Sequence, residues 1–149
     1  MRIGLFGNIL KKFETLGRVI GRIFSRKRTA NACLGKLGED LAVDFLRRKH
    51  FKILRRNWTF GKGEIDIVAL DMSCDVLVFV EVKLRAKGAL IPGYFAVNTK
   101  KKNILRRTCR AYLRNFAAAD IPHRFDVIAV EMCESGSPEI FHYENVKLF

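Results

Sequence analysis

The apolar run from Val76 to Val80 (Val-Leu-Val-Phe-Val) constrains the fold of this chain more than any other segment. Consecutive apolar residues rich in valine are typical of a strand that is covered on both faces inside a sheet. The run is followed at once by Glu81-Val82-Lys83, which puts two charges at the end of a buried strand. We therefore predict a central strand over Val76–Lys83.

The other predicted elements surround this strand in an α/β arrangement. The chain has 149 residues, the length of one typical domain. Gly61-Lys62-Gly63 predicts a turn, residues 86–96 a loop, and Asp71–Asp75 is short enough for an antiparallel hairpin. A further turn is expected at Glu134–Pro138. The predicted helices cover residues 35–49 and 98–116, and the remaining strands cover Phe51–Arg56, Ile65–Asp71, Arg124–Glu131 and Ile140–His142.

The charge of the chain is strongly one-sided and favours a polyanionic partner. It has 28 Lys and Arg against 15 Asp and Glu, a formal net charge of +13. Such a charge favours nucleic acid or an anionic membrane surface. Residues 1–30 contribute much of it and form a basic amphipathic extension with apolar residues at helical spacing. This extension is interpreted as a nucleic-acid-binding arm, a membrane-surface anchor or a loosely held segment.

The cysteines predict neither a zinc site nor a disulfide framework. Cys33, Cys74, Cys109 and Cys133 have no CxxC spacing, and the three histidines follow no zinc pattern. Scattered cysteines of this kind are expected in a reducing cytoplasm, where they act as small apolar residues.

Two acidic residues lie in strands where charge is costly. Glu81 and Lys83 project from the same face of the central strand because strand side chains alternate. Asp66 lies between Ile65 and Ile67, and one hairpin brings it opposite Glu81. Two facing carboxylates repel each other, and a divalent cation such as Mg²⁺ relieves that repulsion. The alternative is an internal salt bridge in which Lys83 neutralises one acid.

Four motifs give the chain a resemblance to a known family over residues 31–149. They are Gly38-Glu39, Gly63-Glu64-Ile65-Asp66, Phe79-Val80-Glu81-Val82-Lys83 and Arg124-Phe125-Asp126. The chain resembles the bacterial YraN family, which is similar to archaeal Holliday-junction resolvases of the restriction-endonuclease-like PD-(D/E)xK superfamily. The resemblance implies an endonuclease-like α/β domain with a mixed central sheet flanked by helices in αβββαβ order.

The resemblance also implies a catalytic site with Mg²⁺ or Mn²⁺ as cofactor. The metal-binding Asp of the superfamily falls on Asp66, its E-x-K motif on Glu81 and Lys83, and its helical Glu on Glu39. The family pattern also has a Lys that falls on Lys101. Phosphodiester cleavage needs an activated water and a counter-charge, which metal ions held by Asp66 and Glu81 would supply. Glu39 would complete a second metal site or position a water.

The second predicted helix is suited to a polyanion. Between Val97 and Ala119 the chain has seven basic residues and no acid. Lys101 leans toward the apolar face of this helix. The other basic residues form either a surface that follows the phosphates of a nucleic acid or simply a solvated basic face. The candidate nucleic-acid-binding residues are Lys101, Lys102, Arg106, Arg110 and Arg114.

Three further residues have a structural and a functional interpretation. Trp58 is either a packed aromatic or a platform for a base. Arg124 and Asp126 are interpreted as an ion-paired structural feature near the site, with a catalytic role as the alternative.

The function predicted from these features is a cytoplasmic, Mg²⁺-dependent, nuclease-like protein that acts on DNA, with branched or flap DNA among the candidate substrates. The alternative is a catalytically inactive nucleic-acid-binding protein of the same fold. A membrane-surface adaptor anchored by residues 1–30 is a third possibility, and a homodimer is left open.

Overall fold

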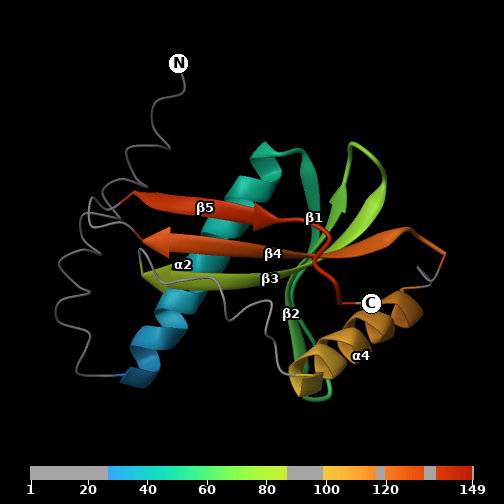
Figure 1. Cartoon of the computed structure of the whole chain (residues 1–149), viewed down its shortest axis with the longest axis horizontal. Helices are drawn as coiled ribbons and strands as arrows, with labels where there is room; N and C mark the ends of the chain where they lie inside the picture. Colours follow the sequence, from blue (N-terminus) through green and yellow to red (C-terminus); the bar gives the residue numbers. More distant parts are fainter. Residues whose placement is uncertain (1–26, 87–98, 117–119, 133–136, 149) are drawn as a thin grey trace.

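The computed structural model describes residues 27–86, 99–116, 120–132 and 137–148 (Figure 1). Most of the predicted extension over residues 1–30, most of the predicted loop over residues 86–96 and residues 134–136 of the predicted turn Glu134–Pro138 lie outside the described residues, whereas Pro138 is the first residue of a strand. Residues 27–30 form the first turn of a helix, and Ala86 ends a strand. Within the described ranges, no helix is long and apolar enough to cross a membrane.

The elements follow the expected order. They are α2 (Lys27–Arg48), β1 (Phe51–Phe60), β2 (Gly63–Asp71), β3 (Val76–Ala86), α4 (Thr99–Asn115), β4 (His123–Met132) and β5 (Pro138–Tyr143). The αβββαβ order is confirmed, and the predicted edge strand is β5. This is the architecture of a restriction-endonuclease-like core.

The five strands form one mixed sheet in the order β1-β2-β3-β4-β5. The predicted central strand is confirmed as β3, which pairs antiparallel with β2 and parallel with β4. The hairpin expected at Asp71–Asp75 joins β2 to β3, and Asp71 pairs with Val76. The parallel pair needs a crossover, and α4 lies on that connection.

Several boundaries differ from the sequence prediction, and among them β3 continues from Lys83 to Ala86 and β5 covers Pro138–Tyr143. Helix α2 begins at Lys27, not at residue 35, because apolar spacing marks only the part of a helix that packs on the sheet. Strand β1 continues from Arg56 to Phe60 with mostly exposed side chains, so it carries no apolar alternation there. Gly63, predicted in the turn, is the first residue of β2 and pairs with Phe60.

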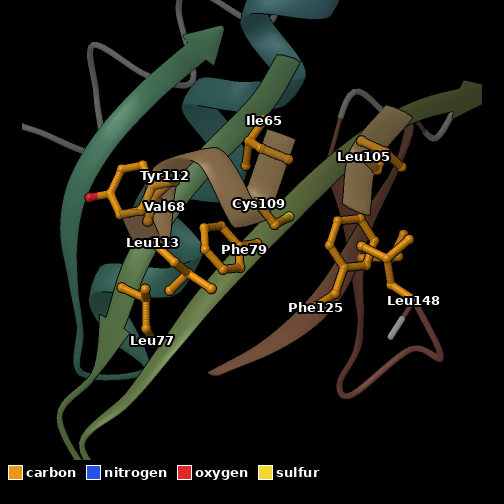
Figure 2. Close-up of a cluster of buried hydrophobic side chains, with 11 residues drawn as sticks. Ile65, Val68, Leu77, Phe79, Leu105, Cys109, Tyr112, Leu113, Phe125 and Leu148 are labelled. Atoms are coloured by element: carbon orange, nitrogen blue, oxygen red, sulfur yellow. The ribbon is translucent and has the colours of Figure 1, made fainter. Parts of the chain in front are cut away.

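The two helices cover opposite faces of the sheet and make two separate cores. On one face, α2 packs Ala42, Val43 and Leu46 against strand residues that include Val78 and Val80. On the other face, α4 packs against the sheet and Leu148 closes the cluster. Figure 2 shows this second cluster. It contains Ile65, Val68, Leu77, Phe79, Leu105, Cys109, Tyr112, Leu113, Phe125, Val127 and Leu148.

Glycines allow each helix to approach the sheet at one place. A Cβ added to Gly38 in α2 would lie 3.3 Å from the Cβ of Leu84 in β3. A Cβ added to Gly63 in β2 would overlap the hydroxyl of Thr108 in α4, which is buried. The glycines of both motifs therefore set how closely α2 and α4 lie against the strands that carry the candidate acids.

The contact at Gly63 gives a stability prediction. Gly63→Ala should lower the free energy of unfolding by about 1–3 kcal/mol, because the added methyl group would overlap the buried Thr108 hydroxyl, which donates a hydrogen bond to the carbonyl oxygen of Ile104. The matched control is Gly35→Ala in α2, where an added Cβ meets nothing within 4 Å. That change should raise stability by up to about 1 kcal/mol through helix propensity. Urea unfolding measures both, and a Gly63→Ala protein as stable as the parent would contradict the close contact.

Candidate active site

The candidate site lies where β2 and β3 stop pairing. The last pair of the ladder is Ile67 with Val80, and the next residue of each strand is Asp66 and Glu81. The main-chain N–H of Val82 donates to Asp66 Oδ2 over 2.6 Å. A side-chain carboxylate thus replaces the strand partner of this amide. The prediction that the hairpin brings Asp66 opposite Glu81 is confirmed, although the ladder ends before them.

Strand β1 is also irregular at this level. Trp58 pairs with Ile65, and Arg56 pairs with Ile67. Asn57 therefore lies opposite Asp66, but these two residues form no ladder pair. Asn57 has φ of 49°, in the left-handed region that Asn adopts more readily than most residues. Ile65 packs in the cluster beneath α4, whereas Ile67 packs in the cluster beneath α2. The strict alternation expected for β2 is therefore wrong at Asp66, which lies where the strand changes faces.

Glu81 is held by two lysines at one oxygen. Lys83 Nζ lies 2.5 Å and Lys101 Nζ 2.7 Å from Glu81 Oε1. The Glu81 side chain is only 7% exposed, so these contacts compensate a charge that is largely removed from water. The salt bridge considered from the sequence is present. Lys101, predicted as a nucleic-acid contact, reaches this site from α4.

Asp66 is not compensated to the same extent. Burial, together with repulsion from Glu81, raises the pKa of the Asp66 carboxyl to about 7. The Val82 amide and the charge of Lys83 oppose this rise, and Glu39 adds a smaller repulsion. The Asp66 carboxyl therefore gains or loses its proton near neutral pH. A carboxylate destabilised in this way is typical of a site that binds a cation.

Glu39 is fastened to β1 at the edge of the site. Its Oε2 accepts a hydrogen bond from Asn57 Nδ2 over 2.9 Å and lies 3.5 Å from Arg56 Nη2. Its side chain is 19% exposed. Glu39 is therefore close enough to repel Asp66, but Asn57 and Arg56, two neighbours that were not predicted from the sequence, direct its carboxylate to β1.

The residues present fit a divalent cation only with further oxygen ligands. Asp66 and Glu81 supply two adjacent carboxylates, and at Asp66 burial and the repulsion from Glu81 outweigh the Val82 amide and the charge of Lys83. Among the described residues, no group of three or more His, Cys, Asp or Glu side chains forms a ready-made metal cage. Mg²⁺ suits such an open site, because it is bound by one or two carboxylates and completes its shell with water and substrate phosphate.

The predicted basic stripe divides into two parts on α4. Arg110 and Arg114 are exposed, whereas Lys102 and Arg106 are half-buried. Arg106 Nε donates to the carbonyl oxygen of Leu148 over 2.9 Å, so this residue holds the end of the chain against the helix. Two members of the stripe therefore remain open to a large partner.

The ion pair predicted between Arg124 and Asp126 is present on the α2 face of the sheet. Arg124 Nε lies 3.1 Å from Asp126 Oδ1, and His142 Nε2 lies 2.9 Å from Asp126 Oδ2. The main-chain N–H of Asn145 also donates to Asp126, which is fully buried. This acid is satisfied by its own partners, as a structural role requires.

Comparison with known proteins places the whole site inside one family match. A model of the uncharacterised protein family UPF0102 matches residues 38–130. A UPF0102 protein of Alkaliphilus oremlandii is 42% identical over 117 residues, covering 77% of this chain and 97% of the relative. A UPF0102 protein of Geobacter metallireducens is 41% identical over 116 residues, covering 77% and 92%. The match begins at Gly38, next to Glu39, and runs past Asp126.

The raised pKa of Asp66 predicts how stability depends on pH. Between the ordinary value of 3.8 and about 7, the folded protein binds more protons than the unfolded chain. The free energy of unfolding should therefore fall as pH rises through this window, by at most about 1.4 kcal/mol for each pH unit. Asp66→Asn should remove this fall and leave the protein more stable than the parent at pH 8 in EDTA.

The matched control is Asp44→Asn, which changes a half-exposed acid of α2 in a surface ion pair with Arg47. Thermal unfolding at pH 5 and pH 8 compares the three proteins. If Asp66→Asn is less stable than the parent protein by the same amount at pH 8 and at pH 5, Asp66 is not the destabilised acid.

Proposed function

The chain belongs to the UPF0102 family, and we propose that this member is a metal-dependent nuclease that cleaves DNA at the site of Asp66, Glu81 and Lys83. The observation that carries the proposal is the pair of adjacent carboxylates at the point where β2 and β3 separate, joined to two lysines. A protein that only binds nucleic acid has no need for a buried acid whose pKa is raised by burial and by a neighbouring acid.

Mg²⁺ or Mn²⁺ would be held by Asp66 and Glu81, where it would supply an activated water and a counter-charge for the transition state of phosphodiester cleavage. The residues prepare this site in different ways. Asp66 would hold the cation through its ionised carboxylate, whose proton burial and the charge of Glu81 stabilise up to a pKa of about 7. Glu81 keeps its position through Lys83 and Lys101, which approach the same oxygen and leave the other oxygen outside these two contacts.

The two lysines also suit the chemistry of the substrate. An ammonium group is a poor ligand for a hard cation but stabilises negative charge that develops on phosphate oxygens. Lys83 is 30% exposed at its side chain and Lys101 is 46% exposed, so both are accessible to an entering phosphodiester. Lys83 orients the attacking water or neutralises charge, and Lys101 adds a second cation from α4.

The charge of the chain supports DNA as the substrate. The net charge of +13 and the exposed side chains of Arg110 and Arg114 favour binding of a phosphate backbone. Branched and flap DNA are the substrate forms to test first. A reducing cytoplasm is the proposed location, and homodimer formation and a membrane contact through residues 1–30 are further proposals.

A second candidate function is supported by the compensated state of Glu81. Because two lysines already neutralise this acid, the same geometry suits an inactive nucleic-acid-binding protein that keeps the fold. Metal binding separates the two candidates, since only the nuclease requires it.

Asp66→Asn and Glu81→Gln should each abolish Mg²⁺-dependent cleavage over a panel of duplex, single-stranded, flap and four-way DNA. Each change removes a ligand charge and little volume, so the domain should remain folded. Calorimetry should show loss of metal binding in both variants. In the parent protein, the cleavage rate at fixed Mg²⁺ should rise with pH up to about 7, as Asp66 loses its proton.

Lys83→Met is the matched control within the same site. It should lower the rate and keep metal binding, because Glu81 retains Lys101. Asp66→Asn also excludes a contaminating nuclease. If both acid variants bind metal as the parent does, the assigned site is wrong, and if Lys83→Met cleaves at the parental rate, Lys83 serves only as an ion-pair partner.

The exposed part of the stripe should control the salt dependence of DNA binding. Arg110→Gln with Arg114→Gln should flatten the slope of log K against log salt by up to about two units, at about 0.9 per lost duplex phosphate contact. These two positions are chosen because Arg106 holds Leu148. Filter binding in EDTA measures the slope in the full chain, where residues 1–26 contribute equally to both proteins.

Lys52→Gln on β1 is the control for loss of an exposed charge away from α4. An unchanged slope in the double variant would show that this face of α4 does not follow the phosphate backbone.

A further inference from the structure

A row of aromatic side chains crosses from α4 to β1 on the face opposite α2. Phe116 and Tyr112 have ring centroids 4.5 Å apart, and Tyr112 meets Trp58 edge to face at 5.4 Å. Trp58 in turn lies parallel to Phe60, with 6.2 Å between centroids and 7° between planes. We call these four residues the aromatic row. Its two ends are open, because Phe60 and Phe116 are each 45% exposed.

One end of the aromatic row forms the wall of a pocket. The pocket has a volume of about 470 Å³ and lies between the tip of the β1–β2 hairpin and the first turns of α4. In Figure 1 this hairpin tip reaches the beginning of α4. The pocket is lined by Phe60 and three cationic residues, Lys62, Lys100 and Arg107, and none of its lining residues is acidic. Its volume lies within the range of small-ligand sites.

This combination has a defined chemical partner. Exposed aromatic faces bind the face of a base, which is available only when the base is unpaired, and cationic residues around them bind the phosphates. At the other end of the row, the Arg55 guanidinium lies 5.6 Å from the centroid of Phe116, so cations accompany the aromatic row at both ends. A buried core requires neither the exposure of Phe60 nor three cations around an acid-free pocket.

We propose that the aromatic row and this pocket bind a single-stranded segment of nucleic acid, with one base against Phe60 and phosphates at Lys62, Lys100 and Arg107. The proposal rests on the proposed function for its substrate class and adds the form of that substrate. The pocket and the acid site share the first turn of α4, where Lys100 lines the pocket and Lys101 contacts Glu81. A strand held in the pocket thus continues toward the acids, as an unpaired flap end would.

The chain carries its own reporter for this test. Trp58 is its single tryptophan and stacks on Phe60. The full chain is titrated in EDTA with oligo(dT) of about ten nucleotides, within the site sizes of single-strand binders, and with an abasic oligonucleotide of the same length. Oligo(dT) should quench Trp58 fluorescence and bind more tightly than the abasic chain, which has the phosphates but no bases.

Phe60→Ala should weaken oligo(dT) binding by about 5- to 150-fold, as expected for the loss of one stacked base, and leave abasic binding unchanged. The affinity of the Phe60→Ala protein is measured by the anisotropy of a labelled oligonucleotide, because Phe60→Ala alters the surroundings of Trp58 and therefore its fluorescence. The matched control is Phe141→Ala on β5, a phenylalanine with 38% exposure outside the aromatic row. The double variant Lys62→Gln with Arg107→Gln should bind both oligonucleotides more weakly. This second variant keeps the test independent of any folding defect in Phe60→Ala.

Equal affinity for oligo(dT) and the abasic chain, or no effect of Phe60→Ala in a folded protein, would overturn the proposal. Because EDTA removes divalent metal, these results are separate from cleavage. A chain that binds oligo(dT) through Phe60 but cleaves nothing supports the pocket and defeats the nuclease. The opposite result is Asp66-dependent cleavage that Phe60→Ala does not change, together with equal binding of both oligonucleotides. That result supports the nuclease and overturns the pocket.

Discussion

The main-chain amide of Val82 loses its strand partner where β2 leaves β3, and the carboxylate of Asp66 accepts its hydrogen bond. An unsatisfied buried amide costs about 1–3 kcal/mol, so this bond holds the end of the ladder together. It also keeps Asp66 inside the protein beside Glu81. This hydrogen bond therefore fixes Asp66 at the end of the ladder, where Lys83 and Lys101 hold Glu81.

Acids elsewhere in the same sheet show how a structural carboxylate is treated. Burial alone would raise the pKa of Asp71, but hydrogen bonds from Ser73 and the contact with Arg124 outweigh it and lower the pKa to about 2. Asp126 is fully buried and has Arg124, His142 and the amide of Asn145 as partners. Asp66 has one amide and a repelling neighbour, and burial raises its pKa to about 7. An acid left in this state costs stability, which is typical of a site shaped for binding or catalysis.

Helix α4 brings three different surfaces to this region. Its apolar side packs on the sheet, with Leu105, Cys109 and Tyr112 buried in the core shown in Figure 2. Its outer side carries the exposed Arg110 and Arg114, and Arg107, seven residues before Arg114, continues this side to the pocket that Lys100 also lines. Lys101 lies between the core and the pocket and reaches Glu81. The close contact at Gly63 holds the helix against β2 and therefore sets the position of all these groups.

The amino-acid sequence alone determined the main elements and the pairing of the two acids. The apolar run of Val76–Val80 identified the central strand, and a short hairpin leaves no other place for Asp66 than near Glu81, because local connections are specified by local residues. The exposed half of β1 and the first turns of α2 escaped prediction, since neither carries an apolar period. The motifs also supported membership of the YraN-like family, which the UPF0102 match confirms.

Only the tertiary structure decided how the charges are divided. Lys101 meets Glu81 and Glu39 is turned to Asn57 and Arg56 because α4 and α2 pack on opposite faces, at distances that no sequence spacing specifies. The change of faces at Asp66 depends on the unpaired position shared with Asn57, which strict alternation does not predict. The aromatic row and its pocket likewise arise where β1 and α4 meet, and contacts between elements distant in sequence form only when the whole core is assembled.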